Sequence, residues 1–292
     1  MNPARISALL EPFLDHPLSE LQLDQISIYI DLLQRWNARI NLSAIRTEEE
    51  IVTRHFGESL FLARHVFPPT PNDVARTPPS ANANTAEMPA PTISSKQRHP
   101  ERSHGIREAD AMAQSKDPYP TSQPSLDKEE AGVSEKVNDG ADRSGSTGNW
   151  QPATGNRVLD IGSGAGFPAL PLKIWAPQIH LTLIESNHKK SAFLKEVARA
   201  LTFTNVDVIT ERTESVLARP ASPRAEVVTL RAVERFEAIL PQAAHFLAAQ
   251  SALALLIGAS QIPKLPTQPT LKWQTPIPIP NSNQRILLLG YK

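Results

Sequence analysis

A glycine-rich stretch is the part of the sequence most informative about chemistry. It runs from Asp160 to Phe167 as Asp-Ile-Gly-Ser-Gly-Ala-Gly-Phe, between a short apolar run and a segment that favours a helix. Glycine is needed where a loop turns tightly and a ligand approaches the backbone, because any side chain would fill that space. Glu185 follows at the end of the next apolar run, where a carboxylate can accept both hydroxyls of a ribose. The turn and this acid predict a site for a nucleoside-containing cofactor.

The spacing of the glycines separates two classes of ligand. A dinucleotide fingerprint requires Gly-x-Gly-x-x-Gly, which allows close helix packing beneath a pyrophosphate. Here the final position is Phe167, followed by Pro168, and the pattern is Gly-x-Gly-x-Gly after Asp160. This form resembles motif I of the S-adenosylmethionine-dependent methyltransferases and implies S-adenosyl-L-methionine as the cofactor. A dinucleotide-dependent oxidoreductase and a glycine turn without a ligand are the alternatives.

The elements that must position this loop are strands that alternate with helices. Apolar runs predict strands at 158–161, 181–184, 206–209, 227–230 and 252–257, with helices at 169–176, 189–201 and 235–247. Residues 271–275 and 285–289 could close the sheet as a hairpin pair. This alternation predicts an α/β, Rossmann-like fold with a mostly parallel sheet covered on both faces.

The N-terminal part is predicted to be helical. Ser19 to Gln22 forms a capping-box pattern, and apolar residues then recur at helical spacing up to Leu33. A second box, Thr47 to Glu50, opens a helix toward Phe67. Trp36, between these helices, is expected to be a packing residue rather than a platform for stacking a base.

Composition divides the chain into three parts. Twelve of the 27 prolines fall within 68–156, where large apolar residues are too few to offset the entropy of ordering the backbone. We therefore expect an N-terminal helical region at 1–67, a disordered low-complexity insert at 68–156 and a catalytic domain at 157–292. A segment that folds on a partner is the alternative for the insert.

Charge and cysteine content exclude several classes of function. The net charge is zero overall, but 157–292 holds 15 basic and 9 acidic residues, which makes this part the better candidate to face a polyanion. The chain has no cysteine, so it has no disulfide, no thiolate metal site and no cysteine nucleophile. Scattered histidines support no metal site. We expect no membrane span and no signal peptide, and a cytoplasmic location.

Several short motifs, in order, resemble the glucose-inhibited division protein B family, the bacterial methyltransferases that modify N7 of a guanine in 16S ribosomal RNA. The residues that carry the resemblance are Arg35-Trp36-Asn37 with Ile40-Asn41-Leu42, Arg54-His55 with Glu58-Ser59-Leu60, 159–172, Glu185-Ser186 with Lys189-Lys190 and Phe193-Leu194, Arg212-Thr213-Glu214, and Leu230-Arg231-Ala232-Val233. They cover nearly all of the chain outside the insert. The resemblance implies a class I methyltransferase sheet, S-adenosyl-L-methionine as cofactor, and 16S rRNA or the small ribosomal subunit as partner. A monomer is the expected state.

The resemblance also implies roles for individual residues. Cofactor contacts are implied for the glycine loop, the ribose-binding acid, the region of the adenine and one arginine: Gly162, Gly164, Gly166, Phe167, Glu185, Thr213, Glu214 and Arg231. Arg231 would lie at the mouth of the site, where it could position the substrate, and Arg212 is a second candidate for substrate contact. A surface ion pair is the alternative for each arginine. His55 is expected to be a hydrogen-bonded structural histidine rather than a catalytic one.

Three positions depart from the family pattern. Glu58 stands where the family has aspartate, and Ala169 stands where it has glycine after Phe-Pro. Ile257 replaces the lysine that commonly precedes the glycine at the end of the fifth strand. This last change removes one implied RNA or substrate contact, and a module that binds cofactor or RNA without turnover is therefore an alternative function.

The implied reaction needs no general base, because guanine N7 presents an unprotonated lone pair at the edge of the base. The segment after the fourth predicted strand, Thr229 to Ala232, also lacks the Asn/Asp-Pro-Pro-Tyr box used for exocyclic amines. We expect Lys189, Lys190, Arg212, Arg231 and the N-terminal arginines to contact phosphate or the target base. A methyltransferase that acts on another substrate is the remaining alternative.

Overall fold

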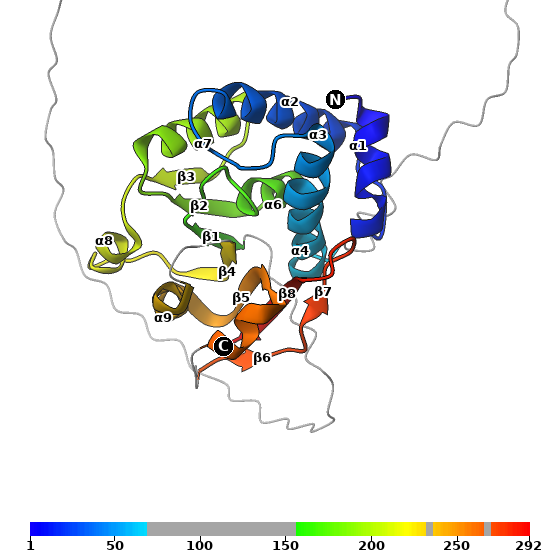
Figure 1. The fold of residues 1–292 in the computed structure, drawn as a ribbon. Coiled ribbons are helices and arrows are strands. Elements are labelled where there is room, and N and C mark those ends of the chain that lie inside the picture. Colours follow the sequence, from blue (N-terminus) through cyan, green and yellow to red (C-terminus); the bar gives the residue numbers. More distant parts are fainter. Residues whose placement is uncertain (69–155, 232–235, 266–269) are drawn as a thin grey trace, which may run out of the picture. The chain divides into compact units, whose positions relative to one another are not determined.

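A computed structural model describes residues 1–68, 156–231, 236–265 and 270–292 (Figure 1). All of these residues belong to one compact unit. The predicted insert, 68–156, lies outside the described residues except for its first and last positions. The N-terminal helices and the described residues from 156 onward lie in this same unit.

An eight-stranded sheet forms the centre of the fold, in the order β3-β2-β1-β4-β5-β8-β6, with β7 also paired to β8. β1 to β5 are parallel, and β8 runs antiparallel to its neighbours. The strands are β1 Arg157–Ile161, β2 His180–Ile184, β3 Val206–Ile209, β4 Ala225–Arg231, β5 Leu247–Gly258, β6 Lys272–Trp273, β7 Ile277–Pro278 and β8 Arg285–Tyr291. The five predicted strands and the α/β, Rossmann-like class are confirmed.

The predicted pairing of 271–275 with 285–289 is confirmed, but the first of these strands is shorter than predicted. β6 does pair with β8, yet it contains only Lys272 and Trp273, and β7 adds a second short partner. β8 is long because both of its faces are buried: Leu287 and Leu289 face one side of the sheet, while Ile286 and Leu288 face the other. This explains its nearly continuous apolar run.

Helices cover both faces of the sheet (Figure 1). One face packs against α2 Glu20–Asn37, α4 Glu58–Val66, α6 Ala169–Trp175 and α7 His188–Ala200. The other packs against α8 Thr213–Leu217 and α9 Phe236–His245. The predicted helices after the glycine loop are confirmed, and the five-residue helix α8 was not predicted because so short an element leaves no periodicity.

The N-terminal helices begin where their caps predict. Ser19 and Gln22 form the capping box of α2, and Thr47 caps α3 Glu48–Glu50 through the backbone N–H of Glu50. The second helix continues from α3 through η2 Ile51–Gly57 into α4, and η2 is wound as a π-helix. The chain starts with α1 Pro3–Leu10 and η1 Glu11–Phe13. In the described ranges, no helix combines the length and apolar character that a membrane crossing requires.

The N-terminal helices and the sheet share a hydrophobic core. Ile26, Ile30 and Leu33 of α2 are buried in the same cluster as Phe193 of α7. Trp36 also packs against this cluster, with its ring 5.7 Å from that of Phe193, so its predicted packing role is confirmed. Removing one side chain from α2 should therefore destabilise the whole unit.

Ile30→Ala is expected to lower the free energy of unfolding by about 2–5 kcal/mol, because Ile30 is fully buried. The matched control on the same helix is Ile28→Ala, which should cost less than about 1 kcal/mol, since Ile28 is 43% exposed. Denaturant unfolding would be followed by circular dichroism and tryptophan fluorescence. Two separate transitions, with only the first shifted by Ile30→Ala, would contradict a shared core.

Candidate functional site

Most of the predicted site residues lie at or just after the carboxyl ends of four adjacent strands, and these ends are aligned across the sheet. Ile161 of β1 pairs with Ile184 of β2 and with Leu230 of β4, and Ile184 pairs with Ile209 of β3. The glycine loop, Glu185, the segment 212–214 and Arg231 therefore lie along one edge of the sheet, at the carboxyl ends of its strands. Ligands of open α/β sheets bind at this edge.

Two glycines of the loop are required for different reasons. Both have positive φ angles, +55° at Gly164 and +87° at Gly166. A Cβ added at Gly164 would find no atom closer than the carbonyl oxygen of Gly162 at 3.7 Å, so the backbone there is open to a ligand. A Cβ at Gly166 would lie 2.3 Å from the hydroxyl oxygen of Tyr29. Gly166 is therefore needed for packing against α2, and its predicted contact with a cofactor stays a prediction.

Glu185 links the loop to α7. One carboxylate oxygen accepts the backbone N–H of Gly164 and the other accepts that of Asn187, each at 2.8 Å. The residue is only 7% exposed. Because each carboxylate oxygen has two lone pairs, both can accept a further hydrogen bond. The carboxylate is thus held in place and still able to bind a pair of hydroxyls.

Asp160 is a buried acid two residues before the glycine loop. Its Oδ1 accepts a hydrogen bond from the hydroxyl of Thr229 at 2.5 Å, whereas its Oδ2 is buried and has no hydrogen-bond partner in the part of the chain that the structure describes. Burial raises the pKa of Asp160 to about 7. An unpaired carboxylate oxygen at this position suits a ligand that carries positive charge.

An aromatic stack holds the end of the loop against the N-terminal helices. The Phe167 ring stacks on Tyr29 of α2 at 5.2 Å and on His55 of η2 at 4.5 Å, with interplanar angles of 5° and 11°. The Tyr29 hydroxyl donates to the carbonyl of Ala165 in the same loop. Phe167 is only 7% exposed and packs against the N-terminal helices, so it fixes the position of the end of the loop.

His55 is structural in this arrangement, as predicted. Its Nε2 is hydrogen-bonded to the Ser43 hydroxyl at 2.7 Å. Burial, with smaller contributions from nearby arginines including Arg231 and Arg54, lowers the pKa of His55 to about 3. The imidazole is therefore neutral at physiological pH, which favours its stacking on Phe167.

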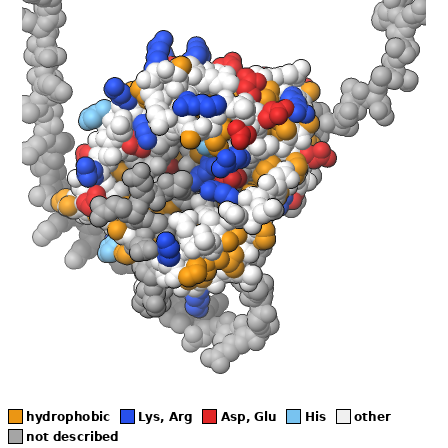
Figure 2. Space-filling model, in the orientation of Figure 1, with side chains coloured by type: hydrophobic (Ala, Val, Ile, Leu, Met, Phe, Trp, Pro, Cys, Tyr) orange, Lys and Arg blue, Asp and Glu red, His pale blue; other side chains and the backbone are white. Residues whose placement is uncertain are grey.

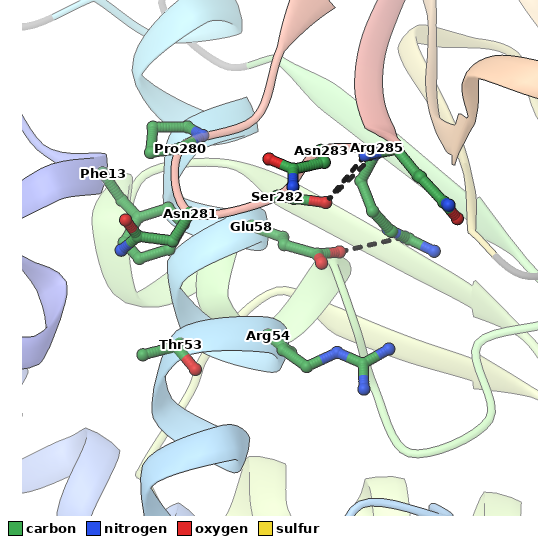
Figure 3. A pocket seen from close by; sticks show the side chains of 10 residues that line it. Phe13, Thr53, Arg54, Glu58, Pro280, Asn281, Ser282, Asn283 and Arg285 are labelled. Atoms are coloured by element: carbon green, nitrogen blue, oxygen red, sulfur yellow. Dashed lines mark hydrogen bonds and ion pairs between the residues drawn. The ribbon is translucent and has the colours of Figure 1, made fainter.

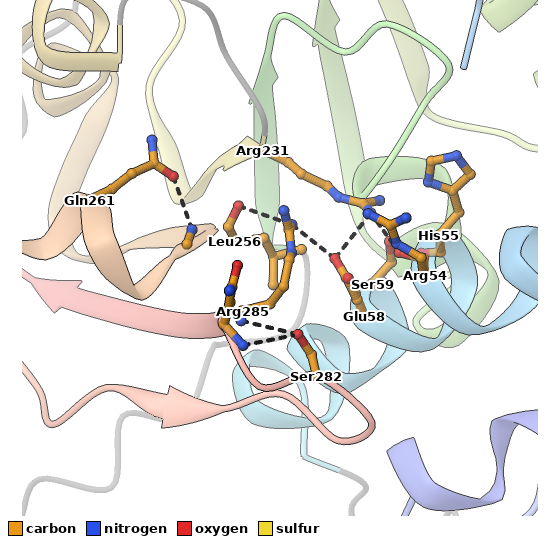
Figure 4. A network of polar contacts seen from close by, with 11 residues as sticks. Arg54, His55, Glu58, Ser59, Arg231, Leu256, Gln261, Ser282 and Arg285 are labelled. Atoms are coloured by element: carbon orange, nitrogen blue, oxygen red, sulfur yellow. Dashed lines mark hydrogen bonds and ion pairs between the residues drawn. The ribbon is translucent and has the colours of Figure 1, made fainter. Parts of the chain in front are cut away.

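Arg231 is held by Glu58, which also binds an arginine that the sequence did not indicate (Figure 4). Glu58 Oε2 accepts from Arg231 at 3.0 Å and from Arg285 at 2.9 Å. Arg231 also donates to the carbonyl of Arg54, and its guanidinium lies 6.0 Å from the centre of the Phe167 ring. Arg231 is therefore not a surface ion pair: its side chain is only 9% exposed, and burial lowers its pKa to about 10.

The other predicted residues lie in different surroundings. Arg212 is exposed at the N-cap of α8, Thr213 is buried, and Glu214 accepts from Gln242 at 3.3 Å. Lys189 and Lys190 lie in the first turn of α7, four and five residues after Glu185, and Lys189 is exposed. Ile257 is buried in the core beneath α8 and α9. Since Arg285 and Leu287 point to the opposite face of the sheet, Arg285 does not replace the absent lysine.

Two residues that shape the site, Tyr29 and Arg285, were not expected from the sequence. Tyr29 contacts the loop across 136 positions, so no local pattern marks it. The only signal for Arg285 is its place at the start of a strand that is otherwise apolar. Arg54 is one of the N-terminal arginines expected to contact RNA, and that contact stays a prediction.

The residues fit a sulfonium nucleoside. The open backbone at Gly164 leaves room for the ligand, Glu185 has free lone pairs for the ribose, and Asp160 has an unpaired oxygen for positive charge. In the described ranges, no group of three or more His, Asp or Glu side chains is arranged to hold a metal ion. The site thus supports cofactor binding through the loop and the acid after β2.

Comparison with known proteins agrees with this geometry. The family model described as rRNA small subunit methyltransferase G matches residues 22–74 and 146–272. Proteins named ribosomal RNA small subunit methyltransferase G are 30% identical over 228 residues in Chloroflexus aggregans and 30% over 217 in Roseiflexus castenholzii, covering 78% and 74% of this chain. These matches span only 60% and 56% of the two relatives. A namesake in Xylella fastidiosa is 25% identical over 288 residues, covering 96% of this chain and 93% of its own.

A solved structure from Escherichia coli, the putative methyltransferase yhhF, is 19% identical and covers 47% of this chain and 76% of its own. Its TM-score of 0.39 is too low to support an inference.

Substitutions at the two glycines should separate folding from binding. Gly164→Ala is expected to cost about 1–2 kcal/mol of stability for the left-handed backbone and to weaken binding of S-adenosylmethionine. Gly166→Ala should destabilise the protein further, because the new methyl group meets Tyr29 and Leu170. Denaturant unfolding and titration calorimetry measure the two effects. Equal loss of stability in both variants would contradict the different roles assigned to these positions.

His55 should make the protein less stable in acid. Its pKa is about 3 when folded and about 6.5 when unfolded, so below pH 6.5 the unfolded chain takes up the proton first. Stability is therefore lost as the pH falls, by about 2 kcal/mol between pH 7 and pH 5 from this residue. His55→Asn should reduce the loss measured by denaturant unfolding at the two pH values. The exposed His180→Gln serves as control, and an unchanged loss in His55→Asn would contradict the neutral, buried imidazole.

Proposed function

Because this chain belongs to the rRNA small subunit methyltransferase G family, we propose that it transfers a methyl group from S-adenosyl-L-methionine to N7 of a guanine in 16S ribosomal RNA. The observation that carries the proposal is the open backbone at Gly164 beside the anchored carboxylate of Glu185. The proposed partner is 16S rRNA or the small ribosomal subunit, encountered in the cytoplasm.

The cofactor would supply a methyl group bound to a sulfonium. The glycine loop would receive its amino-acid part, and Glu185 would accept the hydroxyls of its ribose. Asp160 would face its positive charge. Thr213 and Glu214, at the start of α8, would border the adenine, since they follow the strand next to that of Glu185.

The residues of the site need to position the guanine rather than remove a proton from it. Guanine N7 already presents its lone pair. Holding N7 in line with the methyl group and excluding water can therefore lower the activation free energy of methyl transfer by several kcal/mol. The neutral imidazole of His55 is packed against Phe167 and serves this positioning, not proton transfer. Arg231 would lie beside the bound base, held there by Glu58.

Basic residues on the same side would bind the RNA backbone. Lys189 and Lys190 lie in the first turn of α7, four and five residues after Glu185, and Arg212 precedes α8. Figure 2 shows basic side chains gathered on the upper part of the face presented and near the hollow at its middle. Phosphate contacts of this kind dominate affinity for nucleic acids and weaken as salt rises.

The function is tested with small ribosomal subunits from cells that lack their own enzyme. Incubation with labelled S-adenosylmethionine should place one methyl group on N7 of one guanine, found by mapping the modified base. Glu185→Ala should reduce cofactor affinity about tenfold or more, because charged hydrogen bonds are lost. Nicotinamide dinucleotides should not bind. Cofactor binding without transfer would support the binding-module alternative, and transfer to another acceptor would refute the guanine assignment.

A further inference from the structure

A polar pocket lies on the side of Glu58 where Arg285 and Arg54 meet (Figure 3). It has a volume of about 440 Å³, within the range of small-ligand sites. One wall is the helix formed by η2 and α4, and the other is the turn that leads into β8. Its polar lining includes Arg54, Glu58 and Arg285, together with the turn residues 281–284. We call it the Arg54–Arg285 pocket.

The charges around the pocket favour an anion. One carboxylate, that of Glu58, faces three guanidinium groups. Two of them, on Arg231 and Arg285, share its Oε2, and the third, on Arg54, makes no hydrogen bond or ion pair with another residue that the structure describes (Figure 4). With all four groups ionised, the cluster carries a surplus of two positive charges.

An unpaired guanidinium nitrogen gives a second, independent indication. Nε of Arg285, a residue that lines the pocket, is buried and has no hydrogen-bond partner among the described residues. Leaving charged donors buried and unpaired is costly, and an added oxyanion would relieve that cost.

The uncharged lining suits a phosphate joined to a sugar. Asn281, Ser282, Asn283 and Gln284 follow one another in the turn before β8. Their side-chain amides and the Ser282 hydroxyl can donate to phosphate oxygens or to ribose hydroxyls. Arginine forks bind phosphate in a bidentate manner, which a bare lysine cannot match.

Arg231 connects this pocket to the methyl-transfer centre. It shares Glu58 with Arg285 on one side, and its guanidinium lies over the Phe167 ring of the glycine loop on the other. An anion in the pocket would therefore lie one residue away from the predicted cofactor site.

From these contacts we propose that the Arg54–Arg285 pocket binds a backbone phosphate of the substrate RNA next to the target guanine. The proposal rests on the proposed function. Arg285 and Arg54 contact the phosphate, and Glu58 is a positioning residue that orients the guanidinium groups. The neighbouring phosphate thus fixes the register in which the guanine reaches the cofactor.

The test compares arginine-to-glutamine substitutions in the full chain. Arg54→Gln removes a guanidinium that has no ion pair within the described ranges, so folding should be unaffected. Arg285→Gln breaks a partly buried pair, and Arg285→Lys keeps its charge while losing the fork. The matched control is Arg157→Gln, which removes an exposed, ion-paired arginine at the opposite end of β1. Thermal unfolding confirms that each variant is folded at the assay temperature.

Binding of a 16S rRNA fragment is then measured at several salt concentrations. Arg54→Gln and Arg285→Gln should each weaken binding about tenfold, and each should reduce the slope of log affinity against log salt by about one. Arg285→Lys should retain the salt slope but raise the KM for RNA. Binding of S-adenosylmethionine should be unchanged in all variants, and Arg157→Gln should match the wild type in every assay.

Different failures are distinguishable. RNA affinity and salt slope equal to the wild type in both Arg54→Gln and Arg285→Gln would overturn the pocket proposal alone, provided the wild type methylates 16S rRNA. A wild-type chain that neither binds nor methylates this RNA would overturn the proposed function and the pocket with it. Titration with inorganic phosphate tests whether the pocket binds a free anion instead of RNA. If Arg285→Gln loses phosphate binding but keeps RNA binding, the pocket is a free-anion site and the RNA assignment is refuted.

Discussion

The buried carboxylate of Glu58 is the interaction on which the geometry of the site depends. It stands on the first turn of α4 and binds guanidinium groups from β4 and β8, so one side chain connects an N-terminal helix to two strands. Removing one partner of such a buried pair commonly costs about 3–5 kcal/mol, because the other charge is left uncompensated. This carboxylate, together with the carbonyl of Arg54, holds Arg231 beside the glycine loop.

Local signals in the sequence predicted much of the fold. The caps at Ser19 and Thr47 fixed the beginnings of two helices, since their side chains satisfy backbone donors within the same turn. The apolar runs predicted the parallel strands because burial on both faces leaves little room for polar residues. The π-helical turn at η2 and the short β6 and β7 were not predictable, because their geometry comes from packing between distant segments.

The candidate site divides in the same way. Gly162 to Phe167 and Glu185 could be predicted because a ligand-binding turn and an acid at fixed spacing leave a local pattern. Arg285 and Tyr29 could not, since their roles arise from contacts across more than a hundred residues. Glu58, which departs from the family's aspartate, keeps the negative charge at this position. Its longer side chain still forms ion pairs with both arginines, Arg231 and Arg285.

The contact between Tyr29 and the glycine loop has a consequence for the order of events during biosynthesis. The hydroxyl and its acceptor at Ala165 are 136 positions apart, so α2 leaves the ribosome well before its partner has been synthesised. Meanwhile the apolar face of α2 with Ile26, Ile30 and Leu33 has no sheet to cover it. Because contacts at long sequence separation form late and slowly, this apolar face of α2 stays exposed on the nascent chain until β1 and the glycine loop have been made.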